Sequence, residues 1–254
     1  MRKVFVIFVL LICLSPVADT FGQRSKVMNL PKYDYADYHF GFTLGLNQML
    51  FTVKPVTDLN TRVFTQLQNP DINVDSSMLL GVNSSPTFGF IIGIVGDKHL
   101  GPHVNVRLVP ALVFGERYIN YSILGYRGES ATLIDVEKNI GSVFIDVPVM
   151  FKYKSKRLNN MLAFITAGGQ YSYDIASNAK RRDQTEQIVI RLKQHDFYAV
   201  VGVGFDFYNP WFKLGVELKM AYGLFDMLVR DNTIYTQGIE KLNSKIFQLG
   251  VTFE

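Results

Sequence analysis

Histidine is the first residue type to consider for chemistry, because a neutral imidazole can act as a general base near pH 7. His195 stands beside Asp196, and Ser172 and Ser177 come from the same part of the chain. A serine that such a histidine activates would suit a hydrolase or acyltransferase that acts on lipids. One hypothesis is therefore an outer-leaflet lipid-modifying enzyme that uses His195. The other histidines belong to the opposite end of the predicted fold: His39, His99 and His103.

Sequence signatures of catalysis and metal binding are missing. The chain contains no G-x-S-x-G, H-E-x-x-H or P-loop motif and no metal-spaced cluster. The one cysteine, Cys13, lies in a hydrophobic N-terminal run, so the chain beyond that run has neither a disulfide nor a thiolate. We therefore expect a non-enzymatic protein with no cofactor and no bound metal.

Charged and amide side chains recur on alternate positions of stretches whose other positions are apolar. If these stretches are strands of a small closed barrel, their polar positions face the lumen. Charges in a low-dielectric interior need partners, so we expect an ion-pair and hydrogen-bond plug involving Arg107, Asp146 and Glu217. A charged pore is the functional alternative, but side chains roughly fill a lumen of this size. The predicted lumen network is Asn105, Arg107, Asp146, Lys152, Gln170, Asp206, Lys213, Glu217 and Lys219.

The stretches that carry these residues have a period of two. Residues 40–46, for example, place Phe or Leu at every second position, which is typical of a strand with one apolar face. One stretch is weaker, because Leu162 and Phe164 fall on its otherwise polar side. Pro110 and Pro148 each remove a ladder donor, and we interpret them as bulges. The eight predicted strands centre on 40–46, 88–94, 104–114, 143–151, 160–173, 197–207, 212–222 and 247–253.

The connections between these strands alternate in length. Long loops at one end and tight turns at the other are typical of outer-membrane barrels. We therefore predict an all-β fold: an eight-stranded antiparallel up-and-down transmembrane β-barrel with long extracellular loops and short periplasmic turns. The predicted long loops are 54–86, 117–141, 174–195 and 225–243. The predicted turns are 96–102, 155–159 and 209–210.

A soluble eight-stranded barrel would also alternate, and two features favour the membrane. The polar stripe is rich in glycine, which suits a crowded lumen better than a hydrated outer face. Aromatic residues also collect near strand ends, as in the belts at membrane interfaces. Examples of these belts are Tyr33, Tyr35 and Tyr38, Tyr118 and Tyr121, Tyr171 and Tyr173, and Tyr208 and Trp211.

The N-terminus resembles an export signal. Arg2 and Lys3 precede an apolar run over residues 4–14, and small residues follow. We predict a signal peptide over 1–22, a periplasmic N-terminal segment over 23–38, a barrel over 39–254, and location in the cell outer membrane. The chain of 254 residues has Lys+Arg 26 and Asp+Glu 22; without residues 1–22 these become 24 and 21, a difference of +3. This small excess gives no reason to expect nucleic acid.

Two basic regions lie outside the predicted strands. Lys180, Arg181 and Arg182, followed by Arg191 and Lys193, would face the cell exterior. They could contact anionic lipopolysaccharide or a partner, but we favour the simpler interpretation of a solvated loop. The predicted periplasmic end is also basic, through Lys152, Lys154, Lys156 and Arg157.

Several of these segments resemble the PorT family of outer-membrane proteins of the Bacteroidetes. The resemblance covers residues 30–254, and its most specific part is the turn from Pro148 to Asn160. That turn contains Pro148, Lys154, Ser155, Lys156, Arg157, Asn159 and Asn160. Further segments are Tyr33-Asp34, His39 to Phe42 with Asn47, Arg107 to Pro110, and Phe114 to Arg117.

The resemblance implies a component of the type IX secretion system. This system exports proteins with a C-terminal signal domain, and in gliding members it also delivers surface adhesins. The expected partners are the lipid bilayer, lipopolysaccharide and other components of the system. The family implies no catalytic residues. A small adhesin or binding barrel that acts through its long loops stays open as an alternative, beside the lipid-modifying enzyme.

Overall fold

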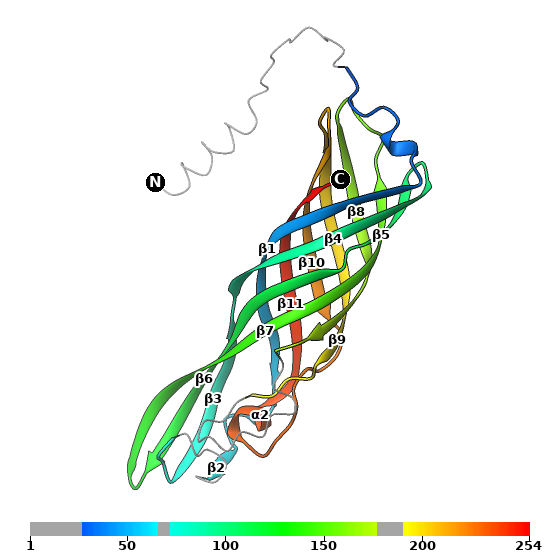
Figure 1. The fold of residues 1–254 in the computed structure, drawn as a ribbon. Helices are drawn as coiled ribbons and strands as arrows, with labels where there is room; N and C mark the ends of the chain where they lie inside the picture. The colour runs from blue at the N-terminus through cyan, green and yellow to red at the C-terminus, as the bar shows by residue number, and fades with distance from the viewer. Residues whose placement is uncertain (1–26, 66–71, 177–189) are drawn as a thin grey trace, which may run out of the picture.

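The computed structural model describes residues 27–65, 72–176 and 190–254. Their strands form one antiparallel sheet that closes on itself (Figure 1). The predicted signal peptide, Cys13, Ser177 and the basic run at 180–182 lie outside the described residues. The strands are β1 (Tyr38–Pro55), β2 (Val63–Thr65), β3 (Ser76–Ser85), β4 (Thr87–Gly101), β5 (Val104–Leu108), β6 (Ala111–Arg127), β7 (Ser130–Lys154), β8 (Met161–Asp174), β9 (His195–Tyr208), β10 (Lys213–Gly223) and β11 (Ile239–Phe253).

Eight strand positions make the ring. It runs from β1 through β11, β10, β9, β8 and β7 to the β5–β6 strand, and then through β4 back to β1. The eight-stranded up-and-down barrel is therefore confirmed. The described helical segments are only a short 3-10 turn, η1 (Tyr33–Tyr35), and the helix α2 (Ile234–Gln237). No helix in the described part of the chain is long and apolar enough to cross a membrane.

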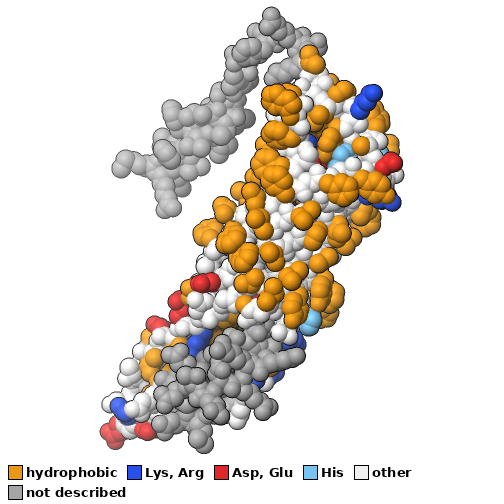
Figure 2. Space-filling model, in the orientation of Figure 1, with side chains coloured by type: hydrophobic (Ala, Val, Ile, Leu, Met, Phe, Trp, Pro, Cys, Tyr) orange, Lys and Arg blue, Asp and Glu red, His pale blue; other side chains and the backbone are white. Residues whose placement is uncertain are grey.

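The apolar stripes face outward. Phe42, Leu46, Phe90 and Val203 are each more than half exposed, and Figure 2 shows hydrophobic side chains spread over the face of the barrel wall that is in view. The intervening positions face the lumen and are mostly buried. A continuous outward apolar band is what the hydrocarbon layer requires. The prediction of which side of each strand faces lipid is thus confirmed.

The two prolines do not form bulges, which corrects that interpretation. β5 and β6 are separated only at residues 109–110, and across this break the register against β4 and against β7 is unchanged. The only shift in these pairings lies at the far end of β5, between His99 and Gly101 of β4. Pro148 lies within β7 opposite Gln170 of β8. Each proline still accepts a ladder bond through its carbonyl: Ile94 donates to Pro110 over 3.0 Å, and Val109 donates to Pro148 over 3.4 Å. Only the donor of each proline is lost, so the pairing continues without a shift.

Two predicted loops contain strands, which is a second correction. Within 54–86 the structure has β2 and β3, and residues 117–141 form the outer part of the β6–β7 hairpin. The hairpin turns at Gly128, whose φ of +57° suits glycine at the first position of a two-residue turn. In Figure 1 this hairpin and β3 extend well beyond the ring. Outside the membrane the outward face becomes polar, so the apolar stripe that marks a membrane strand ends.

Apolar side chains of these extensions build a second core at the loop end. We call it the cap core. The chain segments around α2 and residues 190–192 contribute to it beside the strand extensions. Its central members are fully buried: Leu79, Ile119, Ile123, Tyr235 and Leu242. The loop end is therefore a packed structure rather than a set of independent loops.

Candidate functional site

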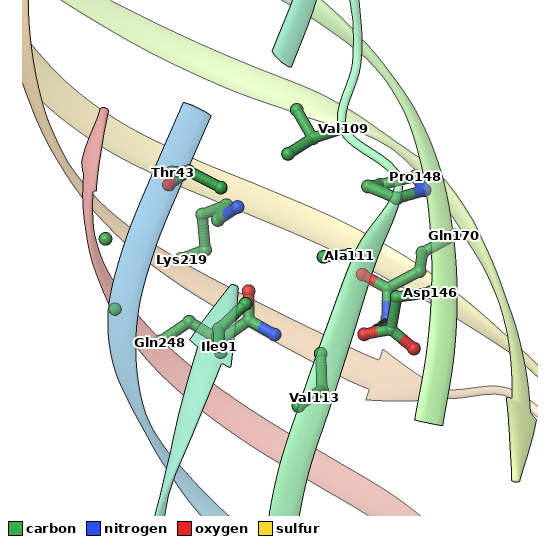
Figure 3. Close-up of a pocket in the computed structure, with 12 residues that line it drawn as sticks. Thr43, Ile91, Val109, Ala111, Val113, Asp146, Pro148, Gln170, Lys219 and Gln248 are labelled. Atoms are coloured by element: carbon green, nitrogen blue, oxygen red, sulfur yellow. Dashed lines mark hydrogen bonds between the residues drawn. The ribbon is translucent and has the colours of Figure 1, made fainter. Parts of the chain in front are cut away.

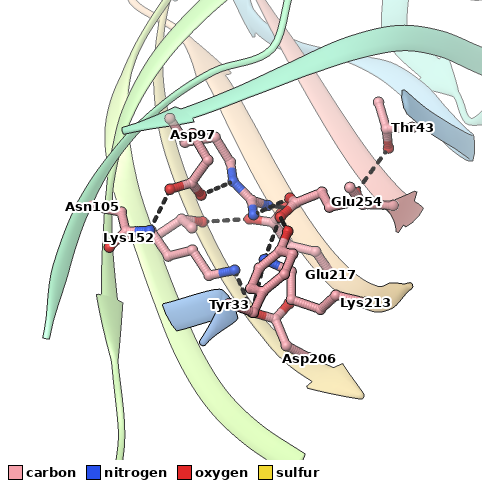
Figure 4. Close-up of polar contacts among 12 residues, drawn as sticks. Tyr33, Thr43, Asp97, Asn105, Lys152, Asp206, Lys213, Glu217 and Glu254 are labelled. Atoms are coloured by element: carbon pink, nitrogen blue, oxygen red, sulfur yellow. Dashed lines mark hydrogen bonds and ion pairs between the residues drawn. The ribbon is translucent and has the colours of Figure 1, made fainter. Parts of the chain in front are cut away.

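The barrel lumen near the short turns is filled by a charged layer around Arg107. This arginine, only 1% exposed, projects from β5. Its Nε lies 3.0 Å from Asp97, and its Nη2 lies 2.6 Å from the side chain of Glu254. Glu217 completes the surroundings at 4.0 Å. Figure 4 shows Asp97, Glu217 and Glu254 pointing into the lumen from three different strands or strand ends.

Two lysines complete this turn-end layer. Lys152 of β7 lies 2.6 Å from Asp206 of β9. Lys213 lies 3.8 Å from the same carboxylate and also pairs with Glu254. Asn105 donates to Asp97, while Thr166 donates to Glu217 over 2.6 Å. Each buried cation therefore faces at least one carboxylate, as burial of charge requires.

Asp146 and Lys219 lie apart from that layer. Gln170 donates to Asp146 over 2.8 Å, and Asp146 has no contact with Arg107. Along β7, Asp146 is six residues from Lys152, which separates them by about 20 Å of strand. Asp146, Gln170 and the half-buried Lys219 line a cavity of about 20 Å³, room for about one water molecule (Figure 3). The expectation that Arg107, Glu217 and Asp146 form one network is therefore wrong for Asp146, which lies apart from the other two.

The middle of the lumen is mainly apolar around the polar cavity of Asp146, Gln170 and Lys219, which the sequence pattern did not indicate. Side chains from most of the ring strands meet there, with Met49, Val113 and Met150 fully buried. The lumen is therefore not polar along its whole length. Apolar side chains separate the turn-end layer from the charges at the loop end.

A second arginine forms the loop-end layer. Arg117 of β6 is fully buried and donates to Ser142 over 2.6 Å and to Ser244 over 2.9 Å. Asp174 is 3.7 Å away. The guanidinium carbon lies 4.3 Å from the ring centre of Phe51, which makes a cation–π contact. The lumen thus has charged layers at both ends and, between them, a mainly apolar layer that also contains Asp146, Gln170 and Lys219.

The turn from Pro148 to Asn160 binds the N-terminal segment. Arg157 donates to the carbonyl oxygens of Asn29 and Leu30 and lies 3.4 Å from Asp34. Asn160 accepts a bond of 2.9 Å from the backbone N–H of Asn29. Asn159 turns the chain here with a φ of +53°, a conformation that asparagine tolerates. We call these contacts the clasp.

The clasped segment inserts an aromatic side chain into the turn-end mouth. Tyr33 stacks on His39 at 4.1 Å between ring centres and donates to Glu254 over 3.1 Å. Burial and the Glu254 carboxylate raise the pKa of Tyr33, which keeps its hydroxyl protonated as a donor. Leu162 and Phe164, the residues on the unexpected side of β8, pack with Tyr33. Their position is explained by this contact.

The other residues of the predicted turn have local roles. Lys154 is buried on the lumen side of β7, and its backbone N–H donates to the carbonyl of His103 over 2.7 Å. Ser155 accepts a bond of 3.1 Å from Ala163 and so joins the two ends of the turn. Lys156 is exposed and accepts only from the Ser155 hydroxyl through its carbonyl.

The closed, lipid-facing ring has counterparts among known outer-membrane proteins. Residues 21–229 match the family described as "Outer membrane protein beta-barrel domain". The chain belongs to this family. Its location is accordingly the cell outer membrane, and the end with the cap core faces the exterior. No curated protein sequence matches the chain.

Solved outer-membrane barrels show a loose likeness at low sequence identity. OprG from Pseudomonas aeruginosa has a TM-score of 0.47 at 10% identity, covering 86% of this chain and 94% of that chain. The N-terminal β-barrel domain of P. aeruginosa OprF has 0.34 at 15%, covering 86% and 98%. Ail, the attachment invasion locus protein of Yersinia pestis, in complex with the heparin analogue sucrose octasulfate, has 0.36 at 11%, covering 86% and 99%.

The candidate catalytic residues of this family member do not meet. His195 is exposed on the outer wall, where Nδ1 lies 2.6 Å from the Tyr171 hydroxyl. Asp196 and Ser172 point into the lumen and are fully buried. Successive residues of a strand face opposite sides of the wall, so neither can orient His195. Among the described residues, no group of His, Cys, Asp or Glu could hold a metal.

Sequence reasoning missed several residues of the charged layers. Asp97 lies within the predicted turn 96–102, Arg117 within a predicted loop, and Glu254 follows the last strand. Each continues the lumen-facing parity of its strand: Asp97 after Val95, and Glu254 after Thr252. Extending the alternation past the last outward apolar residue would have found them.

Proposed function

We propose that this outer-membrane barrel is a non-enzymatic, non-conducting scaffold of the type IX secretion machinery. The observation that carries the scaffold role is the closure of the lumen by buried ion pairs at Arg107 and Arg117, with apolar side chains between them. Within the part of the chain that the structure describes, such a barrel offers neither a water-filled path nor an assembled catalytic group. Its function then belongs to the surfaces that it presents on the two sides of the membrane.

The secretion role rests on the resemblance of the turn from Pro148 to Asn160 to the PorT family. In this chain the same turn holds the N-terminal segment through Arg157 and Asn160, which gives the periplasmic face a fixed shape. A fixed face is suited to binding other components of a machine, because little ordering entropy is lost on association. We therefore place the proposed partner contacts of the secretion system at this end.

A binding barrel is the second candidate, and the cap core is the observation that favours it. The β6–β7 hairpin and β3 form a stiff sheet outside the membrane, paired from Ser76–Tyr126 to Ser85–Tyr118. Binding residues are often presented on scaffolds of this kind. Truncating the hairpin to remove residues 120–137 would separate the candidates: lost ligand binding with intact secretion would favour the binding barrel.

Deletion of the gene tests the secretion role. Proteins with a C-terminal signal domain should accumulate inside the deletion strain and reach the surface again when the wild-type gene is restored. Normal surface display in the deletion strain would refute the proposal. Lipid A mass spectra of the same strain, with and without a His195→Ala gene, test the enzyme alternative; a scaffold predicts identical spectra.

A further inference from the structure

A group of lysines lies on the outer wall of β1 and β11 at the loop end. Lys54 and Lys241 are directly opposite each other in the ladder, and Lys245 follows four residues along β11, opposite Leu50. Lys54 and Lys241 are exposed, and Lys245 is half-buried. Four residues of strand span about 14 Å. The three ammonium groups therefore line one short stretch of the wall.

Their charge is only partly balanced by the protein. Lys54 pairs with Glu240 at 2.7 Å, and this pair is exposed. Within the described residues, neither Lys241 nor Lys245 forms an ion pair. Like charges directly opposite each other in a ladder are unfavourable. An external anion at this position would relieve that repulsion.

The lysines stand at the border between the lipid-facing wall and the polar cap. Lys245 lies 5.1 Å from the ring centre of Phe247, the next outward residue of β11, and Leu249 continues the apolar stripe. Tyr222 of β10 is directly opposite Lys245. Basic side chains above an aromatic belt lie at the level of lipid headgroups, with their stems along the acyl region.

We propose that Lys54, Lys241 and Lys245 bind a phosphate-bearing glycolipid of the outer leaflet. The ammonium groups of Lys241 and Lys245 bind the phosphate groups of the glycolipid, while its acyl chains lie along Phe247 and Leu249. A soluble acidic partner would match the charge but would leave this apolar wall unused. The lipid fits both halves of the surface.

Binding of defined lipids to the purified full-length chain in detergent tests the proposal. The probes are lipid A with its phosphates, the same lipid A after phosphatase treatment, and inorganic phosphate. The variants are the double change Lys241→Gln with Lys245→Gln and, as a rescue, the corresponding double change to Arg. Lys98→Gln is the matched control, because Lys98 also lies over an aromatic ring, 5.5 Å from Tyr38, but at the turn end.

The phosphorylated lipid should bind the wild-type chain and the Lys98 variant equally. The double Gln variant should bind it at least about tenfold more weakly, since it removes two cations close to the anionic headgroup. The double Arg variant should retain binding. Equal binding of the dephosphorylated lipid, unchanged binding by the double Gln variant, or displacement of the lipid by millimolar inorganic phosphate would each overturn the proposal.

Discussion

Arg107 and Arg117 differ in what surrounds them, although both are buried arginines of the same wall. Arg107 is within 4.0 Å of three carboxylates, whereas Arg117 has a single carboxylate at 3.7 Å and two serine hydroxyls. Arg117 also lies between the rings of Phe51 and Phe144. An apolar replacement at the first site would leave Asp97 and Glu217 without an ion-pair partner, although Glu254 would keep Lys213. At the second site only Asp174 would lose its partner.

We predict that Arg107→Met lowers the free energy of unfolding by about 3–5 kcal/mol, because it removes one partner of a buried ionic network. Arg117→Met should lower it less, since a methionine suits the aromatic surroundings. Unfolding in urea, followed by tryptophan fluorescence in lipid vesicles, measures both.

The control for these variants is an exposed pair. Arg62 lies 2.6 Å from Asp58 at the surface of the cap, and exposed pairs of this kind contribute about 0–1 kcal/mol. Arg62→Met should therefore change stability little. A loss at Arg107→Met no larger than the loss at Arg62→Met would contradict the structural role of the turn-end layer.

At the scale of elements, close approach of the strands depends on glycine at particular lumen positions. A Cβ on Gly89 of β4 would overlap the carbonyl oxygen of Phe114 and lie 2.7 Å from the Asn47 amide oxygen. A backbone oxygen cannot move aside without breaking the ladder. Gly141 of β7, in contrast, has nothing within 4 Å of such an atom.

Gly89→Ala is therefore expected to destabilise the barrel by at least about 1–3 kcal/mol, the usual effect of overpacking. Gly141→Ala is the matched control in another strand and should have little effect. The heat-modifiable band shift of folded barrels on gels, recorded as a function of temperature, distinguishes them. Equal melting of both variants would show that the strands do not approach as closely as described.

The clasp is the element that holds the N-terminal segment, and Arg157 is its centre. Arg157→Ala should expose Lys32 to a lysine-specific protease at least about tenfold faster, because charge-assisted hydrogen bonds contribute about 1.5–3 kcal/mol. Lys156→Ala removes a neighbouring cation that has no side-chain contact with the segment, so cleavage should stay slow. Rapid cleavage in the wild-type chain would contradict the clasp.

The sequence predicts the ring far better than its two ends. Outward apolar stripes identify all eight ring positions, because lipid selects apolar residues there whatever the neighbouring strand. The apolar alternation ends at the membrane boundary, so the sequence predicts loops where the structure has β3 and the outer part of the β6–β7 hairpin. The clasp is not predictable in the same way: Arg157 donates to the carbonyl of Asn29, and backbone acceptors 128 residues away leave no side-chain signal. The sequence indicated the turn from Pro148 to Asn160 only through its resemblance to the PorT family.

The whole molecule is a stack of layers along the barrel axis. From the turn end these are the clasped N-terminal segment, the layer of Arg107, the mainly apolar middle with its small polar cavity, the layer of Arg117 and the cap core. Each layer closes the lumen by a different kind of contact. Function is therefore expected at the outer surfaces, with a periplasmic face shaped by the clasp and an exterior face shaped by the β6–β7 hairpin.

Single-channel recording in planar bilayers tests this closed scaffold most directly. The purified full-length chain is inserted next to a known porin as a positive control, and insertion is verified by recovery of folded protein from the membrane. We predict a flat baseline for this chain under voltages at which the porin conducts. Steady, large single-channel steps from the folded chain would contradict the plugged lumen and the scaffold role that rests on it.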